Sequence, residues 1–197
     1  MWRRAKPWRE TLFWSLDLET TGLDVRRDEI LSVGMVPIHQ GAIRWGERYY
    51  TEVRPPGDAG SDAVPIHQIL PDQLDTAPPL EEILPGVLEK LEDATLVVHY
   101  AQLDVTMLER ACRDLGLRWP KPPVVDTMDL IASYDRRRRL IEPESSVRRK
   151  PTPYQLGMIR EFLDLPPHDE HHALHDALAT AELLLVLRAR LDLERLG

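Results

Sequence analysis

Asp17 and Glu19 are the first residues whose types and spacing suggest chemistry. They lie at the end of the largely apolar segment 11–18 and are separated by one residue, so the two-residue period of a β-strand places both carboxylates on one face. A Thr-Thr-Gly sequence follows and indicates a tight turn whose backbone can approach a ligand closely. Acids are also common where a strand simply ends in solvent, so the pair alone leaves both interpretations open.

Two further acids, Asp104 and Asp176, lie at the expected starts of helices. Carboxylate oxygens are the ligands that Mg²⁺ and Mn²⁺ prefer, and several acids at strand and helix ends can face one cleft. Two such cations about 3.5–4 Å apart can activate water and stabilise charge during phosphodiester hydrolysis. For Asp104 alone, a helix N-cap is the simpler alternative.

Three histidines, His171, His172 and His175, precede Asp176 closely. An imidazole titrates near neutral pH and therefore suits a general base. Without the distant acids, the same histidines would be interpreted as a solvated helix start or an opportunistic metal cluster.

The elements that must position these residues form an α/β pattern. Strands are predicted at 11–18, 29–38 and 42–53, with a turn at 39–41 between the last two, which gives an antiparallel three-stranded meander. Later elements are a helix at 80–91, bent or interrupted by Pro85 and Gly86, then strands at 95–99 and 124–125 and helices at 104–115, 127–134, 154–162 and 173–190. We therefore expect a mixed central sheet flanked by helices.

Residues 1–197 are predicted to form a single domain with its core at about 11–190. The segment 135–153 is rich in arginine and contains three prolines, which predicts an exposed, mobile basic loop that could contact substrate.

The composition favours a globular protein of a reducing cytoplasm. The chain has 197 residues, 43% of them hydrophobic, and a single cysteine, and no apolar run reaches the roughly 18 residues that a membrane span needs. Its formal charge of −8 disfavours binding of a polyanion, but acids that bind cations create a locally positive site.

The three acidic regions occur in the order SLDLETTGLD, VVHYAQLDVTMLER and HHALHDALATAELL. Together they resemble the DEDDh branch of the 3′→5′ exonucleases, the superfamily of proofreading exonuclease subunits, ribonuclease T and oligoribonuclease. The resemblance covers about Phe13 to Leu187. It implies a ribonuclease-H-like fold and release of nucleoside 5′-monophosphates from the 3′ ends of single-stranded DNA or RNA.

The resemblance also implies roles for residues. Asp17 would bind both of two divalent cations, Mg²⁺ or Mn²⁺, with Glu19 and Asp176 completing one site and Asp104 holding the second ion. His171, five residues before Asp176, would be the general base. His172, four residues before Asp176, is the alternative, because a related branch places tyrosine there and one helical face could carry both residues.

Substrate contacts are expected from Thr20, Thr21, Gly22 and Leu23, with Leu23 either a wedge against the last base or a core residue. The family usually has asparagine where this chain has Tyr100, so the usual contact to the terminal nucleotide is replaced, and Tyr100 could stack on a base. His99, before it, could be a structural histidine or a substrate contact, and we do not count it as catalytic.

Other functions remain open from the sequence. One is a module that docks on a polymerase or binds nucleic-acid ends without cutting them, with Trp2 and Trp8 as candidate docking residues that could equally pack on this domain. Another is a hydrolase of short oligonucleotides or dinucleotides.

Overall fold

A central β-sheet organises the computed structural model, which describes residues 7–56, 69–141 and 151–193. The strands are β1 (Phe13–Thr20), β2 (Ile30–His39), β3 (Ala42–Ile43), β4 (Tyr49–Glu52), β5 (Thr95–Val98) and β6 (Val124–Asp126). Their order is β3-β2-β1-β5-β6, and β4 also pairs with β2. β1, β2, β3 and β4 are antiparallel neighbours, whereas β1, β5 and β6 run parallel. The predicted mixed sheet with its meander is confirmed.

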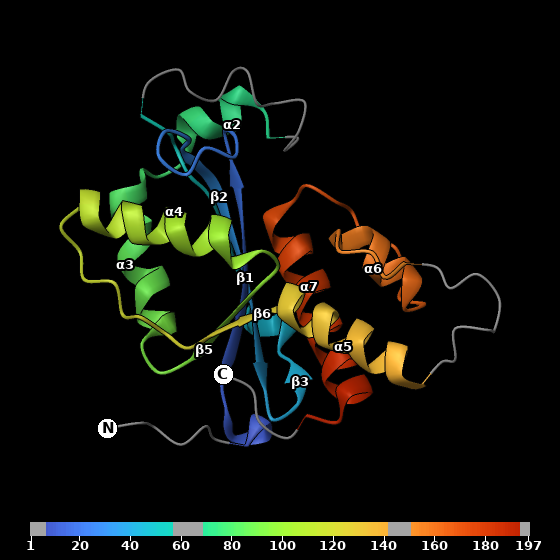
Figure 1. Cartoon of the computed structure of the whole chain (residues 1–197). Coiled ribbons are helices and arrows are strands. Elements are labelled where there is room, and N and C mark those ends of the chain that lie inside the picture. The colour runs from blue at the N-terminus through green and yellow to red at the C-terminus, as the bar shows by residue number, and fades with distance from the viewer. Residues whose placement is uncertain (1–6, 57–68, 142–150, 194–197) are drawn as a thin grey trace.

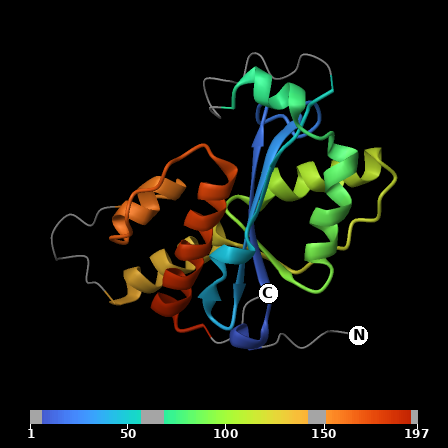
Figure 2. The same cartoon turned by 180° about the vertical axis from the view of Figure 1, so that it is seen from behind.

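Helices cover both faces of this sheet (Figures 1 and 2). On one side lie α3 (Leu80–Leu91) and α4 (Ala101–Asp114), and on the other α5 (Thr127–Ile141), α6 (Leu156–Phe162) and α7 (Ala173–Leu191). The short helix α2 (Pro71–Thr76) lies beyond one end of the sheet, and single turns, η1 (Trp8–Glu10) and η2 (Trp45–Glu47), precede β1 and β4. None of the helices in the described ranges is long and apolar enough to cross a membrane.

β1 is buried on both of its faces. Trp14, Leu16 and Leu18 pack in a core with residues of α3 and α4, and Phe13 packs on the opposite face with residues of α7. The face that carries Phe13 also carries Ser15 and Asp17, so the pleat directs Asp17 toward the α7 layer.

Several expected boundaries differ in the structure. The segment 42–53 is not one strand, because η2 separates β3 from β4, although both pair with β2. α3 is not interrupted at Pro85 and Gly86, since its buried face, including Leu84, Val87 and Leu91, packs on the sheet. That burial outweighs the hydrogen bond that proline removes.

The predicted basic loop at 135–153 begins later than expected, because α5 continues to Ile141. Asp135 is buried, and it accepts hydrogen bonds from the Thr152 hydroxyl at 2.6 Å and from Arg139 Nε at 2.7 Å. These contacts support the last turns of α5. Residues 142–150 of the predicted loop lie outside the described residues.

Candidate active site

Asp17 and Glu19 are held by the middle of the sheet. In the register between β1 and β2, Asp17 lies opposite Gly34 and Glu19 opposite Ser32. The register shifts between Glu19 and Thr20, where β1 leaves the sheet. Both carboxylates therefore extend from a buried strand toward the helix layer that contains α7, as the strand period predicts.

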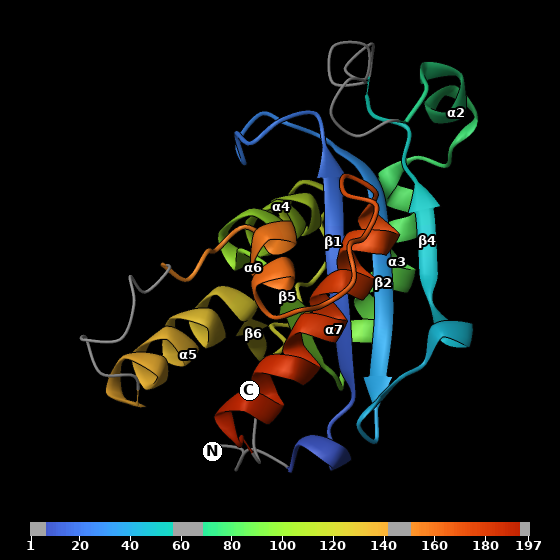
Figure 3. The ribbon, with the colours of Figure 1, turned by 90° about the vertical axis from the view of Figure 1, so that its right-hand side faces the viewer.

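Gly34 allows α7 to come close to this strand. A Cβ built on Gly34 would lie 2.2 Å from the carbonyl carbon of Ala173 and 2.3 Å from the backbone nitrogen of Leu174. α7 therefore begins directly on the backbone of β2, next to Asp17, and it crosses the sheet from that point (Figure 3). No side chain other than hydrogen fits at residue 34 without moving the helix.

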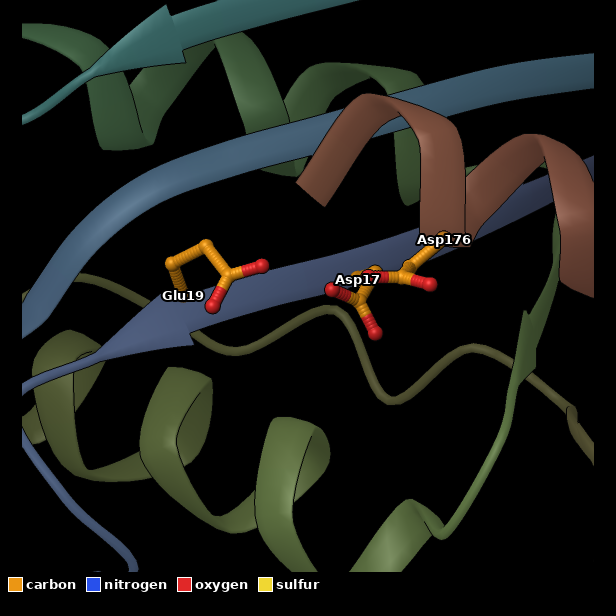
Figure 4. A group of neighbouring side chains, drawn as sticks. All are labelled: Asp17, Glu19 and Asp176. Carbon is orange, nitrogen blue, oxygen red and sulfur yellow. The ribbon is translucent and has the colours of Figure 1, made fainter. Parts of the chain in front are cut away.

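This close approach brings Asp176, in the first turn of α7, to the acids of β1. Oxygens of Asp17, Glu19 and Asp176 all lie within 4.8 Å of one another. Figure 4 shows Asp17 and Glu19 extending from β1 and Asp176 pointing from α7 toward them. Three carboxylates at this spacing form a set of hard oxygen ligands for a divalent cation.

Asp104 comes from the opposite helix layer. α4 begins at Ala101, three residues before the predicted start, so Asp104 lies in the first turn and the interpretation of Asp104 as an N-cap is wrong. Its side chain is buried, and within the described residues it lies outside the compact group of three acids. It is still close enough to raise the pKa of Asp17 electrostatically.

Burial and repulsion between carboxylates raise the pKa values of three of these acids. Burial, followed by repulsion from Asp104, Asp176 and Glu19, raises the pKa of Asp17 well above its usual value. Burial, with repulsion from Asp176 and Asp104, raises the pKa of Glu19 to about 8. The pKa of Asp104 is also raised to about 8, mainly by burial, although hydrogen bonds from backbone groups oppose the shift.

Asp176 differs from the acids of β1 because it has partners on both oxygens. Its Oδ2 accepts hydrogen bonds from the backbone N–H groups of His171, at 2.8 Å, and His172, at 3.3 Å. Its Oδ1 lies 2.8 Å from Nε2 of His168. The segment that precedes α7 therefore wraps around this carboxylate.

The adjacent histidines of this segment have different surroundings. His172 is the N-cap of α7, not a helical residue, and its ring stacks between Tyr50, at 4.7 Å, and His175, at 4.3 Å. Burial and the neighbouring His175 lower its pKa. His171 has a φ of 66° and is exposed, with no hydrogen bond from its ring within the described residues. His172 consequently lies just before the helix and does not share a helical face with Asp176, as the sequence interpretation had allowed.

The predicted substrate-contacting turn follows β1. Thr20 Oγ1 donates a hydrogen bond to the carbonyl of Gly22 at 2.6 Å, and Thr21 Oγ1 donates to Asp28 at 3.0 Å. These hydroxyls therefore stabilise the turn. Leu23 is 81% exposed, so its interpretation as a core residue is wrong.

Tyr100 is the residue that precedes α4. It has φ 80° and ψ 68°, a left-handed conformation that asparagine adopts more readily than tyrosine, and its side chain is half exposed. Asp126 fixes this backbone by accepting hydrogen bonds from the N–H groups of Tyr100, Ala101 and Met128. Asp126 thereby caps α4 and α5 together.

His99 has the structural role that the sequence suggested. Its Nδ1 lies 2.8 Å from Thr127 Oγ1, and its Nε2 lies 2.8 Å from the carbonyl oxygen of Tyr154. Both ring nitrogens are therefore satisfied, and His99 ties β5 to the segment before α6.

The sequence interpretation missed His168 and Gly34. His168 lies eight residues before Asp176, a separation at which no helical or strand period would pair them. Gly34 lies inside a strand pattern, where a glycine indicates a close backbone approach, and this was the one available signal.

Comparison with known proteins assigns the chain to a family. A family model described as Exonuclease, RNase_T, matches residues 15–184. The PolC-type DNA polymerase III of Thermotoga maritima is 34% identical over 177 residues, which are 89% of this chain and 12% of the relative. The 3′-5′ exonuclease DinG of Staphylococcus haemolyticus is 26% identical over 186 residues, which are 94% of this chain and 19% of the relative. The chain therefore spans only a small part of either relative.

Among solved structures, E. coli Exonuclease I in complex with a dA16 oligonucleotide has a TM-score of 0.76 at 16% identity, over 91% of this chain and 41% of that one. At this identity the likeness concerns the fold, and it confirms the expected ribonuclease-H-like architecture. Since the family model covers most of the sequence, the chain belongs to the RNase_T exonuclease family, within the superfamily of DEDD-type 3′→5′ exonucleases.

Proposed function

We propose that this protein is a metal-dependent 3′→5′ exonuclease that hydrolyses the last phosphodiester bond of single-stranded nucleic acid and releases nucleoside 5′-monophosphates. The observation that carries the proposal is the meeting of Asp17, Glu19 and Asp176 within 4.8 Å in a chain of the exonuclease family. Fold alone would not support a function, but this site supplies the required groups.

The acids fit divalent cations. Within the described part of the chain, neither Asp17 nor Glu19 has a hydrogen bond or an ion pair with a cationic side chain; Glu19 is buried and Asp17 is partly buried. Buried carboxylates without a cation are unfavourable, as their raised pKa values indicate. Mg²⁺ or Mn²⁺ would remove this cost.

We assign the ligands of two such cations from the family resemblance. Asp17 would be shared, Glu19 and Asp176 would complete one site, and Asp104 would belong to the second. When bound, the two cations would activate water and neutralise charge on the attacking and leaving oxygens.

His171 is the proposed general base. Its exposed ring and its position beside Asp176 leave the imidazole available to take a proton from the attacking water. His172 is disfavoured because its ring is stacked between Tyr50 and His175. His171→Gln should therefore reduce turnover far more than His172→Gln.

Exposed apolar groups flank the acids and fit the end of a strand. Leu23, which follows β1, and Tyr100, which precedes α4, are both exposed, so one can wedge against the last base and the other can stack on a base. The backbone of Thr20, Thr21 and Gly22, whose turn is fixed by its own hydrogen bonds, would approach the terminal sugar.

We propose DNA as the preferred polymer. A relative is named a DNA polymerase, and the similar solved structure holds a deoxyadenosine oligonucleotide. The same relative favours a second candidate role, a proofreading domain that works beside a polymerase. Co-elution with a replicative polymerase in size-exclusion chromatography would support that role, and separate elution would oppose it.

The decisive experiment measures product formation from single-stranded DNA and RNA labelled at either end. Reactions would contain Mg²⁺, Mn²⁺ or EDTA, with Asp17→Ala as the inactive control. We expect mononucleotides from the 3′ end with metal only, and faster cleavage of DNA. Faster cleavage of RNA would reverse the preference, and absence of cleavage under every condition would contradict the proposed activity.

A further inference from the structure

His168 contacts an acid of the site but has no assigned role. Its Nε2 lies 2.8 Å from Asp176 Oδ1, and both side chains are largely buried, at 10% and 13% exposed. The backbone N–H groups of His171 and His172 hold the other oxygen of the same carboxylate. The imidazole is therefore the only side chain in the described residues that fixes the rotation of Asp176.

The segment that carries His168 is anchored to the fold. Arg160 of α6, 2% exposed, donates hydrogen bonds to the carbonyls of Pro166 and Ala179, each at 2.9 Å, and forms an ion pair with Glu182 at 2.7 Å. One buried guanidinium thereby joins the chain just before His168 to α7, the helix of Asp176.

Pro166 and Pro167 restrict the backbone between this anchor and His168. His168 also contributes to the lining of a pocket of about 310 Å³ beside α7. The 2.8 Å contact links the imidazole to the carboxylate, so each group orients the other.

We infer that His168 is a positioning residue for Asp176, holding the carboxylate in the rotation that allows it to bind a divalent cation together with Asp17 and Glu19. The inference rests on the proposed function, because it takes these acids as cation ligands. Groups that hydrogen-bond to a ligating carboxylate commonly change metal affinity about 10–100-fold when they are removed.

Three variants test this role with Mn²⁺ alone, in isothermal titration without nucleic acid. His168→Phe keeps a ring of similar size, which the cavity accommodates, but has no nitrogen, whereas His168→Gln can still donate a hydrogen bond to Asp176. We expect the phenylalanine variant to bind Mn²⁺ about 10–100-fold more weakly and the glutamine variant to remain within a few-fold of wild type. His39→Ala, at the exposed end of β2, is the matched control and should bind as wild type does.

Thermal unfolding in EDTA separates positioning from a general structural effect. The phenylalanine and glutamine variants should unfold at similar temperatures although their Mn²⁺ affinities differ. Wild-type affinity in His168→Phe, or tighter binding, would overturn the positioning role while leaving the exonuclease proposal intact. If wild type itself binds no Mn²⁺, the cation site and this inference both fail.

Discussion

The charge of Asp17 disfavours the folded state but favours binding of a cation. Asp17 lies among other acids in a partly buried site, and burial is the largest cause of its raised pKa. A residue selected only for stability would not be ionisable there. The neighbouring carboxylates repel one another, but each of them would attract a bound cation.

Replacing Asp17 by asparagine should therefore separate the two effects. We expect Asp17→Asn to lower the exonuclease rate about a thousandfold or more, since a cation ligand is lost, yet to raise the melting temperature in EDTA at pH 8 by roughly a few degrees. Calorimetry and a 3′-end cleavage assay measure both. A lower melting temperature in EDTA would show that the charge is not destabilising.

The raised pKa of Glu19 predicts how the free energy of unfolding depends on pH when metal is removed. Its pKa is raised from the usual 4.5 to about 8, so between these values the folded state holds a proton that the unfolded state has released. The contribution of Glu19 to the free energy of unfolding therefore falls as the pH rises through this window, and it becomes constant above it.

The measurement is the melting temperature in EDTA from about pH 5 to pH 9, for wild type and Glu19→Gln. The decline with pH should be shallower in the variant, because glutamine does not titrate. Parallel curves for the two proteins would contradict the raised pKa. Other acids titrate over the same range, and the comparison between variants isolates Glu19.

At the scale of elements, the contact between β2 and α7 decides whether a site exists. Gly34 lies opposite Asp17 in the sheet and under the first residues of α7. A methyl group there would lie 2.2 Å from the backbone of Ala173, well below an ordinary van der Waals contact. The helix backbone cannot rotate away as a side chain could. The start of α7 would have to move away from Asp17.

Gly34→Ala should consequently destabilise the protein by about 1–3 kcal/mol and weaken binding of Mn²⁺. Gly86→Ala is the matched control: residue 86 lies in α3 with open space around it, so alanine should stabilise by roughly 0.5–1 kcal/mol. Denaturant unfolding measures both free energies. Equal effects of the two substitutions would mean that the contact with α7 is unimportant.

Local sequence patterns predicted which helices and strands form better than they predicted the contacts between these elements. The strand period at Asp17 and Glu19 and the apolar spacing of α7 are properties of neighbouring residues, and the structure has both elements. The approach of α7 to Gly34 joins segments far apart in the sequence, and no period encodes it. His168 was missed for the same reason, because its partner lies across an irregular segment.

The end of α5 shows how tertiary contacts override composition. A run of four arginines with few apolar residues predicted a loop from Asp135. In the structure, Asp135 is buried and pairs with Arg139 and Thr152, and Arg138 lies over the ring of Phe162 at 4.8 Å. Contacts with Thr152 and Phe162, both later in the chain, therefore stabilise the end of a helix that the local sequence does not favour.

For the whole molecule, the proposed cation site should contribute to stability as well as to activity, because a bound cation would offset part of the formal charge of −8. A ligand that binds only the folded state adds a stabilisation that grows with its concentration relative to Kd, about 2.7 kcal/mol at 100 times Kd. For a chain of this size, that corresponds to a rise in melting temperature of roughly 5–10 °C. Mn²⁺ should therefore stabilise the protein measurably without any nucleic acid.

Specific binding must be distinguished from screening of the net negative charge. Screening by salt acts on all exposed acids, whereas a bound cation needs Asp17 in particular. We expect the melting temperature to rise with Mn²⁺ at constant ionic strength in wild type, and to lose most of that rise in Asp17→Asn, although the variant retains nearly all of the net charge. An equal rise in both proteins would mean that Mn²⁺ acts on the surface as a whole, and the acids of β1 and α7 would then not form the cation site.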